Sequence, residues 1–169
     1  MPRSPFITDI VALRRHQGHR ERLAVRAPLA DLRVTGSEVP AGRDVDLELV
    51  LEAVEGGILV AGEARAPWRG ECRRCLGPVE GEVTAEVDEL FATDFEEGET
   101  YPIRGDHIDL EPLAREVLVL GLPLAPLCRP DCAGLCPTCG ADLNLGDCGC
   151  PPVDADPGWA ALDALRPEP

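Results

Sequence analysis

Eight cysteines are the residues of this sequence with the clearest chemistry, and they stand in four local pairs. The pairs are Cys72 with Cys75, Cys128 with Cys132, Cys136 with Cys139, and Cys148 with Cys150. Thiolate sulfur is a preferred zinc ligand, and a structural zinc takes four ligands in a tetrahedron, with sulfur at about 2.3 Å. A short spacer lets two sulfurs of one turn face the same ion while backbone N–H groups stabilise their charge. Four pairs therefore predict two structural zinc sites.

Three arrangements join these four pairs into two sites. Only eight residues separate Cys139 from Cys148, so the third and fourth pairs can close a local hairpin around one ion. The first and second pairs would then form a long-range clasp. We favour this arrangement, because joining the second pair to the third crowds one ion between adjacent turns. The single residue between Cys148 and Cys150 is the weakest feature, because so short a spacer is strained when both sulfurs bind one ion.

A redox function is the alternative chemistry for the third pair. Cys136 and Cys139 form a Cys-Pro-Thr-Cys motif that a thiol-disulfide oxidoreductase or a redox sensor could use. That function is typical of a βαβ context, whereas the Gly, Asp and Asn residues around this motif indicate a loop. A catalytic zinc keeps an open coordination position, but here the thiols come in fours, and His16, His19 and His107 are scattered. The sequence also contains no phosphate-binding loop and no nucleophile motif. We therefore expect that the protein is not an enzyme.

Aromatic and cationic side chains around the first pair are candidates for a contact with RNA or another partner. They are Trp68, Arg69, Arg73 and Arg74. An aromatic face can stack on a base while guanidinium groups bind phosphate. The plainer interpretation is that Trp68 packs in the fold and the arginines are solvated.

The charge of the chain restricts its partners. The 169 residues carry a formal net charge of −15. Residues 1–33 hold seven arginines against three acidic residues, a local charge of +4 that leaves −19 on the rest of the chain. An acidic body repels phosphate backbones, so we expect a basic protein partner rather than a broad nucleic-acid groove. The alternative is that the acidity only keeps the protein soluble.

The sequence also predicts the compartment. The apolar run at 6–13 is short, contains Asp9 and precedes no cleavage site. No segment approaches the roughly 20 apolar residues that span a bilayer. We therefore expect a cytoplasmic protein with no membrane partner. Thiols stay reduced in that compartment, which favours metal binding over disulfides.

Three strands must position the first cysteine pair. From Asp44, apolar residues alternate with acidic ones, and the alternation resumes after a Glu-Gly-Gly turn and again after Pro78. A period of two predicts half-buried strands, so we expect residues 44–91 to form an antiparallel meander with the first pair in its second turn. Residues 1–43 should form N-terminal strands, as a loose hairpin or two extended pieces, and then a connecting loop at 37–43.

A helix must bring the second pair to the sheet. The acidic stretch 92–108 is expected to be an irregular surface loop, after which Asp109 can cap a helix at 109–121. The expected apolar stripe of this helix consists of Leu110, Leu113, Val117 and Leu120. A short C-terminal helix is expected from Asp156, with Trp159, Leu162 and Leu165 on one side.

Together these elements predict an α+β fold. It should contain an antiparallel meander in a partly closed sheet, one packing helix, and a cysteine-rich, zinc-ribbon-like module. We expect a β-rich body at 1–127 and a zinc-binding module with the short C-terminal helix at 128–169. This length suits one domain with an appendage.

Four segments resemble the YceD-like family, described as large ribosomal RNA subunit accumulation proteins. They are ECRRCLGPVEGEV, DHIDLEPLAREVLVLGLPLAPLC, DCAGLCPTCGADLN and DPGWAALDAL. The resemblance covers nearly the whole chain and is most specific between Cys72 and Asn144. It implies a bacterial, cytosolic, non-enzymatic protein linked to ribosomal RNA processing or large-subunit assembly. With the acidic charge, it implies a basic ribosomal protein as partner or, through the arginine-bearing tip, ribosomal RNA, and no small-molecule substrate.

Overall fold

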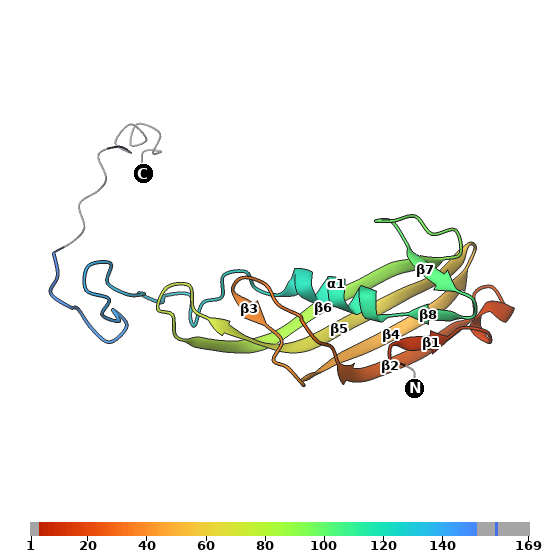
Figure 1. Ribbon diagram of the computed structural model, residues 1–169, viewed down its shortest axis with the longest axis horizontal. Helices are drawn as coiled ribbons and strands as arrows, with labels where there is room; N and C mark the ends of the chain where they lie inside the picture. The colour runs from red at the N-terminus through yellow and green to blue at the C-terminus, as the bar shows by residue number, and fades with distance from the viewer. Residues whose placement is uncertain (1–3, 152–157, 159–169) are drawn as a thin grey trace.

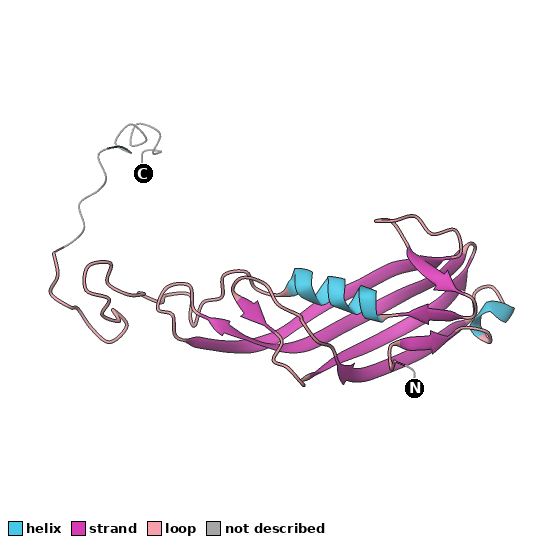
Figure 2. Ribbon diagram, in the orientation of Figure 1, coloured by secondary structure: helices cyan, strands magenta, loops and turns pink. Residues whose placement is uncertain are grey.

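Three long strands with alternating apolar residues form the centre of the protein. The computed structural model describes residues 4–151 and Gly158, and it shows an eight-stranded sheet with a helix along one face (Figure 1, Figure 2). The strands are β1 (Ile7–Asp9), β2 (Arg20–Pro28), β3 (Ser37–Glu38), β4 (Asp44–Val54), β5 (Gly57–Glu71), β6 (Pro78–Ala92), β7 (Tyr101–Arg104) and β8 (His107–Asp109). Their order in the sheet is β1-β8-β7-β6-β5-β4-β2, with β3 paired to β5.

One side of this sheet carries the core. In β4 every second residue from Val45 to Ala53 is buried, and alternate residues of β5 and β6 continue the same apolar layer. The helix α1 (Glu111–Gly121) covers this side with Leu113, Ala114 and Leu118, and the sheet curls partway around it (Figure 2). The prediction of a mainly antiparallel sheet with one packing helix is confirmed for the described residues, which add only a 3-10 turn, η1 (Leu13–Arg15).

The N-terminal region forms two extended pieces and not a hairpin. β1 pairs with β8, whereas β2 pairs along its whole length with β4. The segment 37–43, expected to be only a connecting loop, begins with β3, whose two residues pair with Gly70 and Arg69. This short strand supports the end of β5 next to the first cysteine pair.

The acidic stretch 92–108 is only in part the surface loop that the sequence predicts. Its second half forms β7, which runs parallel to the last two residues of β6, and β8, which returns antiparallel to β7. Gly105 turns the chain between them with φ +62°. Ile108 in β8 is fully buried. Strands of three or four residues are too short to show a reliable alternation, and their pairing depends on tertiary contacts.

The helix is found where the sequence predicts it, but its buried stripe is shifted. Asp109 Oδ1 accepts a hydrogen bond from the first helical N–H at 3.0 Å, and the helix ends at Gly121. Leu118 is fully buried, whereas Leu120, expected in the stripe, is 79% exposed. A Cβ at Gly121 would lie 2.7 Å from Val83 Cγ2. The helix thus approaches the sheet along its small residues, and Leu120 falls at the edge of the contact.

The segment after α1 leads to the tip of the β5–β6 hairpin and extends beyond it (Figure 1). This segment carries the six C-terminal cysteines. The short helix expected from Asp156 lies outside the described residues. Among the helices of the described part of the chain, none has the length and apolar character needed to span a membrane.

Candidate metal centres

The first cysteine pair lies in the turn between β5 and β6. The ladder of these two strands continues to their ends, so only residues 72–77 form the turn. The Cys72 N–H donates to Gly77 O at 2.8 Å, and the Leu76 N–H donates back to Cys72 O at 2.9 Å. These two bonds close a tight knuckle, in which Leu76 takes a left-handed φ of +58°.

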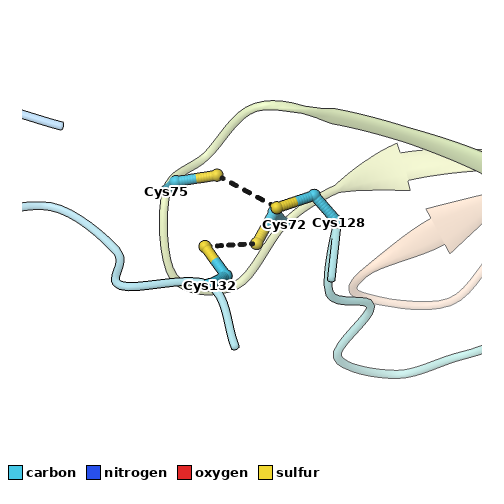
Figure 3. Close-up of side chains that lie close together, drawn as sticks. All are labelled: Cys72, Cys75, Cys128 and Cys132. Carbon is cyan, nitrogen blue, oxygen red and sulfur yellow. Dashed lines mark hydrogen bonds between the residues drawn. The ribbon is translucent and has the colours of Figure 1, made fainter. Parts of the chain in front are cut away.

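The second pair reaches this knuckle from the segment after α1 (Figure 3). The Sγ atoms of Cys72 and Cys132 lie 3.8 Å apart, and those of Cys75 and Cys128 lie 3.7 Å apart. All four sulfurs lie within 4.8 Å of one another. We call these four residues the first cluster.

The distances in the first cluster match a tetrahedral metal site and not a disulfide. Four sulfurs bound at about 2.3 Å to a central zinc ion stand about 3.8 Å from each other. A disulfide requires a separation of about 2.05 Å. Cys72 and Cys132 are buried, so the polypeptide closes part of the site off from solvent. The donor set and its spacing therefore fit a closed, structural zinc site.

The remaining four cysteines repeat the same knuckle. The Cys136 N–H donates to Ala141 O at 2.8 Å, and the Gly140 N–H donates to Cys136 O at 2.8 Å. Gly140, with φ +76°, holds the position that Leu76 holds in the first knuckle. The sulfurs of this group also lie within 4.8 Å of one another. The group, called the second cluster, consists of Cys136, Cys139, Cys148 and Cys150.

A glycine allows the one-residue spacer of the second cluster to close. Gly149 takes φ +70°, and its N–H donates to Asp147 Oδ1 at 3.0 Å. Glycine adopts this left-handed conformation without steric cost, so the chain can turn sharply between Cys148 and Cys150. The structure thus groups the eight thiols in the arrangement that the sequence favours. That they hold zinc stays a prediction.

Backbone hydrogen bonds prepare one thiol of each cluster for metal binding. Such bonds, chiefly one from the backbone of Cys128, lower the pKa of the Cys72 thiol to about 6. The same effect, chiefly from the backbone of Cys139, lowers the pKa of the Cys136 thiol to about 6. Zinc binds the thiolate form of cysteine, so each cluster has at least one thiol that ionises near neutral pH.

Other thiols of the clusters hold their protons more tightly. The hydrogen bond with Cys132 is the main cause that raises the pKa of Cys128 to about 12. The hydrogen bond with Cys139 likewise raises the pKa of Cys150 to about 12. These protons must leave when a metal ion enters, so metal binding would release protons and weaken as the pH falls.

Two of the four residues expected to contact RNA or a partner are engaged within the fold. Arg69 donates to Glu38 Oε1 at 2.7 Å. Trp68 covers the neighbouring strand, since a Cβ at Gly81 would lie 2.9 Å from Trp68 Cζ2. The glycine leaves room for the indole, and the partly buried ring packs against the core. The structure therefore supports ordinary packing for Trp68.

The other two residues lie on the first knuckle and differ in their contacts. Arg74 Nη1 donates to Cys132 O at 2.8 Å and to Pro130 O at 3.3 Å, which fastens the second pair to the knuckle. Arg73 donates its backbone N–H to Pro126 O at 2.9 Å, and its side chain is exposed. Arg69 and Arg73 both line one surface depression beside the knuckle, whereas the Arg74 guanidinium is bonded to the segment after α1. That the four residues contact RNA or a partner stays a prediction.

Asn144 is a functional candidate that sequence reasoning missed. It lies between the third and fourth pairs, yet its Nδ2 donates to Cys132 Sγ of the first cluster at 3.4 Å. Burial raises the pKa of the Cys132 thiol, but the hydrogen bond from Asn144 and others outweigh burial, so the pKa is lowered. No spacing pattern identifies this contact, because Asn144 lies in the loop between cysteines of the second cluster whereas Cys132 belongs to the first.

Comparison with known proteins identifies a family whose sequences resemble this chain. The model of the family described as large ribosomal RNA subunit accumulation protein YceD matches residues 60–166. An uncharacterized protein of Mycobacterium tuberculosis is 41% identical over 175 residues, which cover 98% of this chain and 84% of that protein. An uncharacterized protein of Mycobacterium leprae is 36% identical over 174 residues, which cover 98% of this chain and 80% of that protein.

A named plant protein is similar to part of the chain. The chloroplastic large ribosomal RNA subunit accumulation protein YCED homolog 1 of Arabidopsis thaliana is 30% identical over 105 residues. These residues cover 53% of this chain and 33% of the plant protein. No solved structure matches the chain significantly.

Proposed function

We propose that this chain, which belongs to the YceD family of large ribosomal RNA subunit accumulation proteins, is a non-enzymatic accessory factor in the accumulation of large-subunit ribosomal RNA. It acts in the bacterial cytoplasm by binding a ribosomal component. A β-rich body at 1–127 provides the binding surface. A cysteine-rich module at 128–169, zinc-ribbon-like in its ligands, completes the metal sites.

Two structural zinc ions complete the proposed fold. One is held by Cys72, Cys75, Cys128 and Cys132, and the other by Cys136, Cys139, Cys148 and Cys150. The all-sulfur donor sets and their tetrahedral spacing support zinc, and closed sets of four are typical of structural sites. Zinc bound there supplies a crosslink and no reaction. In the first cluster, the cysteines fasten the tip of the β5–β6 hairpin to the segment after α1.

A row of glutamates on the open face of the sheet supports a basic ribosomal protein as the partner. Glu48 of β4 is paired with Glu63 of β5, which is paired with Glu86 of β6. The three side chains point away from α1, because alternate residues of these strands face the core. Like charges directly opposite each other on neighbouring strands are destabilising.

The row is only partly neutralised within the chain. Arg65 pairs with Glu63, and this hydrogen bond is the main cause that raises the pKa of the guanidinium. Glu82 and Asp88 extend the acidic surface along β6. A shallow depression of about 470 Å³, lined in part by Glu48, Arg65 and Glu82, lies on this face. Lysine or arginine side chains of a partner would relieve the repulsion, whereas RNA phosphates would increase it.

The glutamate row is the observation that carries the proposal, and removing its charge tests it. The combined change Glu48→Gln, Glu63→Gln and Glu86→Gln keeps the side-chain shapes and removes three charges. We expect a protein that is at least as stable, since the repulsion is lost. Its affinity for purified basic large-subunit proteins, measured by calorimetry at low salt, should fall about tenfold or more.

A matched control carries the same charge change on another surface. Glu96→Gln, Glu97→Gln and Glu99→Gln together alter the exposed loop before β7 and should leave binding unchanged. Naked large-subunit RNA should bind weakly to either variant. Tight RNA binding with a steep dependence on salt, unaffected by the change in the row, would contradict a basic protein as the partner.

The alternative of a thiol-disulfide oxidoreductase or redox sensor gains no support. Cys136 and Cys139 share their cluster with two further thiols, as a metal site requires. Within the described residues no α-helix follows the Cys-Pro-Thr-Cys motif, although a βαβ context is typical of the redox motif.

A further inference from the structure

A loop of the second cluster contributes a hydrogen bond to the first. Residues 140–147 connect Cys139 to Cys148, so a metal ion in the second cluster would hold both ends of this loop. Near its middle, Asn144 Nδ2 donates to Cys132 Sγ at 3.4 Å. Cys132 belongs to the first cluster. The side chain of Asn144 therefore joins the two groups of thiols.

The amide of Asn144 is held in one orientation. Its Oδ1 accepts hydrogen bonds from the Ala133 N–H at 2.9 Å and from Arg129 Nη2 at 2.6 Å. A backbone N–H can only donate, so the amide oxygen must face Ala133 and the amide NH₂ must face the sulfur. The same NH₂ donates to Asp142 Oδ1 at 2.6 Å, within the loop itself. Each polar atom of the amide is thus used.

Backbone contacts place the loop of the second cluster against the first knuckle. The Leu143 N–H donates to Gly134 O at 2.9 Å, and the Leu135 N–H donates to Arg74 O at 3.1 Å. A Cβ at Gly134 would lie 3.0 Å from Arg74 O, so the two segments approach closely. Any loosening of the second cluster would therefore disturb the position of Asn144 relative to Cys132.

We infer that Asn144 couples the two clusters, so that metal binding in the second cluster raises the metal affinity of the first. This inference rests on the proposed structural zinc sites. Metal in the second cluster fixes the loop and so positions the amide that stabilises the Cys132 thiolate. Outer hydrogen bonds of this kind change metal affinity by about 10- to 100-fold. By linkage, metal in the first cluster raises the affinity of the second by the same factor.

Zinc titration followed by native mass spectrometry tests the coupling. Cys148→Ser with Cys150→Ser gives the affinity of the first cluster alone, and Cys72→Ser with Cys128→Ser gives that of the second cluster alone. We expect the wild type to bind two zinc ions with a combined affinity about tenfold or more above the product of the two single-cluster values. When half of the zinc sites are filled, most molecules should carry either no zinc ion or two, and molecules with one zinc ion should be scarce.

Asn144→Ala should remove the cooperativity and keep the stoichiometry of two zinc ions. Protein with one zinc ion would then become abundant at half saturation. Leu145→Ala, at an 87% exposed position in the same loop, is the matched control and should retain the cooperativity. Comparing Asn144→Ala with the wild type tests the inference even if a serine variant does not fold.

The outcomes separate the coupling from the metal sites themselves. Two zinc ions that bind independently in the wild type would overturn the coupling and leave the zinc sites intact. Cooperative binding that survives Asn144→Ala would also overturn the role of Asn144. Wild-type protein that binds no zinc would remove both the zinc assignment and the inference. None of these results depends on the identity of the ribosomal partner.

Discussion

The two cysteine knuckles have the same backbone hydrogen bonds but different support from the rest of the fold. In each, the first cysteine donates its N–H to the residue five positions later and accepts from the residue four positions later. The left-handed position is Leu76 in one knuckle and Gly140 in the other. The first cluster joins Cys72 to Cys132, 60 positions away, whereas the second closes locally at 136–150.

This difference explains why the left-handed position is a leucine in one cysteine knuckle and a glycine in the other. A leucine stays in the left-handed region only where surrounding structure enforces that conformation. The first knuckle is enforced by the β5–β6 ladder and by the segment bound to its turn. In the second, the paired structure is the isolated bridge between Leu135 and Asp142, and the left-handed position is a glycine. The two knuckles share one backbone conformation, and the support from the rest of the fold determines which residues can adopt it.

The largest expected effect comes from removing one cluster at a time. Cys72→Ser with Cys132→Ser should lower the free energy of unfolding by about 3 kcal/mol or more in zinc-containing buffer, because metal binding is part of folding. Cys148→Ser with Cys150→Ser should lower it less, because the second cluster closes locally and can keep its metal when the body unfolds; the expected loss is about 1.4 kcal/mol, the equivalent of a tenfold weaker first cluster. Urea unfolding followed by far-ultraviolet circular dichroism measures both. Equal losses of unfolding free energy in the two variants would contradict the distinction between a long-range clasp in the first cluster and a local hairpin in the second.

A smaller effect is expected when the second knuckle receives the residue of the first. Gly140→Leu places a leucine in the left-handed region, which costs about 1–2 kcal/mol. With little surrounding structure to enforce the turn, the zinc affinity of the second cluster should fall about tenfold, as measured by chelator competition. Ala141→Leu adds a similar side chain at an exposed neighbouring position and serves as the control. Unchanged affinity in Gly140→Leu would show that both knuckles tolerate leucine equally.

The smallest effect is expected from the reverse change, and its sign is opposite. Leu76→Gly removes the left-handed strain, while the side chain, 61% exposed, buries little apolar surface. After the greater flexibility of glycine in the unfolded chain is subtracted, the free energy of unfolding should rise by about 0.5–1 kcal/mol. Leu124→Gly, at a 70% exposed position, should instead be neutral or destabilising in the same urea titration. A loss of stability in Leu76→Gly would mean that the leucine packs more than its exposure suggests.

Sequence reasoning succeeded where one local pattern determines the structure. The meander of β4, β5 and β6 follows from the alternation of apolar and polar residues. This pattern extends over so many residues that single exceptions do not obscure it. The grouping of the thiols follows from spacing, since the eight residues between Cys139 and Cys148 let these two pairs close a local hairpin. Both signals are carried by neighbouring residues and need no knowledge of the rest of the fold.

The remaining features depend on contacts between distant segments. The helix stripe is shifted because Ala114 and Gly121 allow a close approach that hydrophobicity does not reveal. The ion pair of Arg69 with Glu38 could not be foreseen, because Glu38 belongs to β3, a strand of two residues. Asn144 was missed because its sulfur acceptor belongs to the other cluster. Each of these partners can be identified only once the topology is known.

The outer side of β6 has a consequence for how copies of the protein behave toward one another. β6 pairs with β7 only at Phe91 and Ala92, so within the described residues most of its outer edge has no strand beside it. Open edges recruit further strands and promote aggregation. Pro78 begins this strand, and carboxylates at Glu80, Glu82, Glu86 and Asp88 line its exposed side, so a second copy would meet repulsion there. The charge assigned to attracting a basic partner would also keep identical molecules from joining edge to edge.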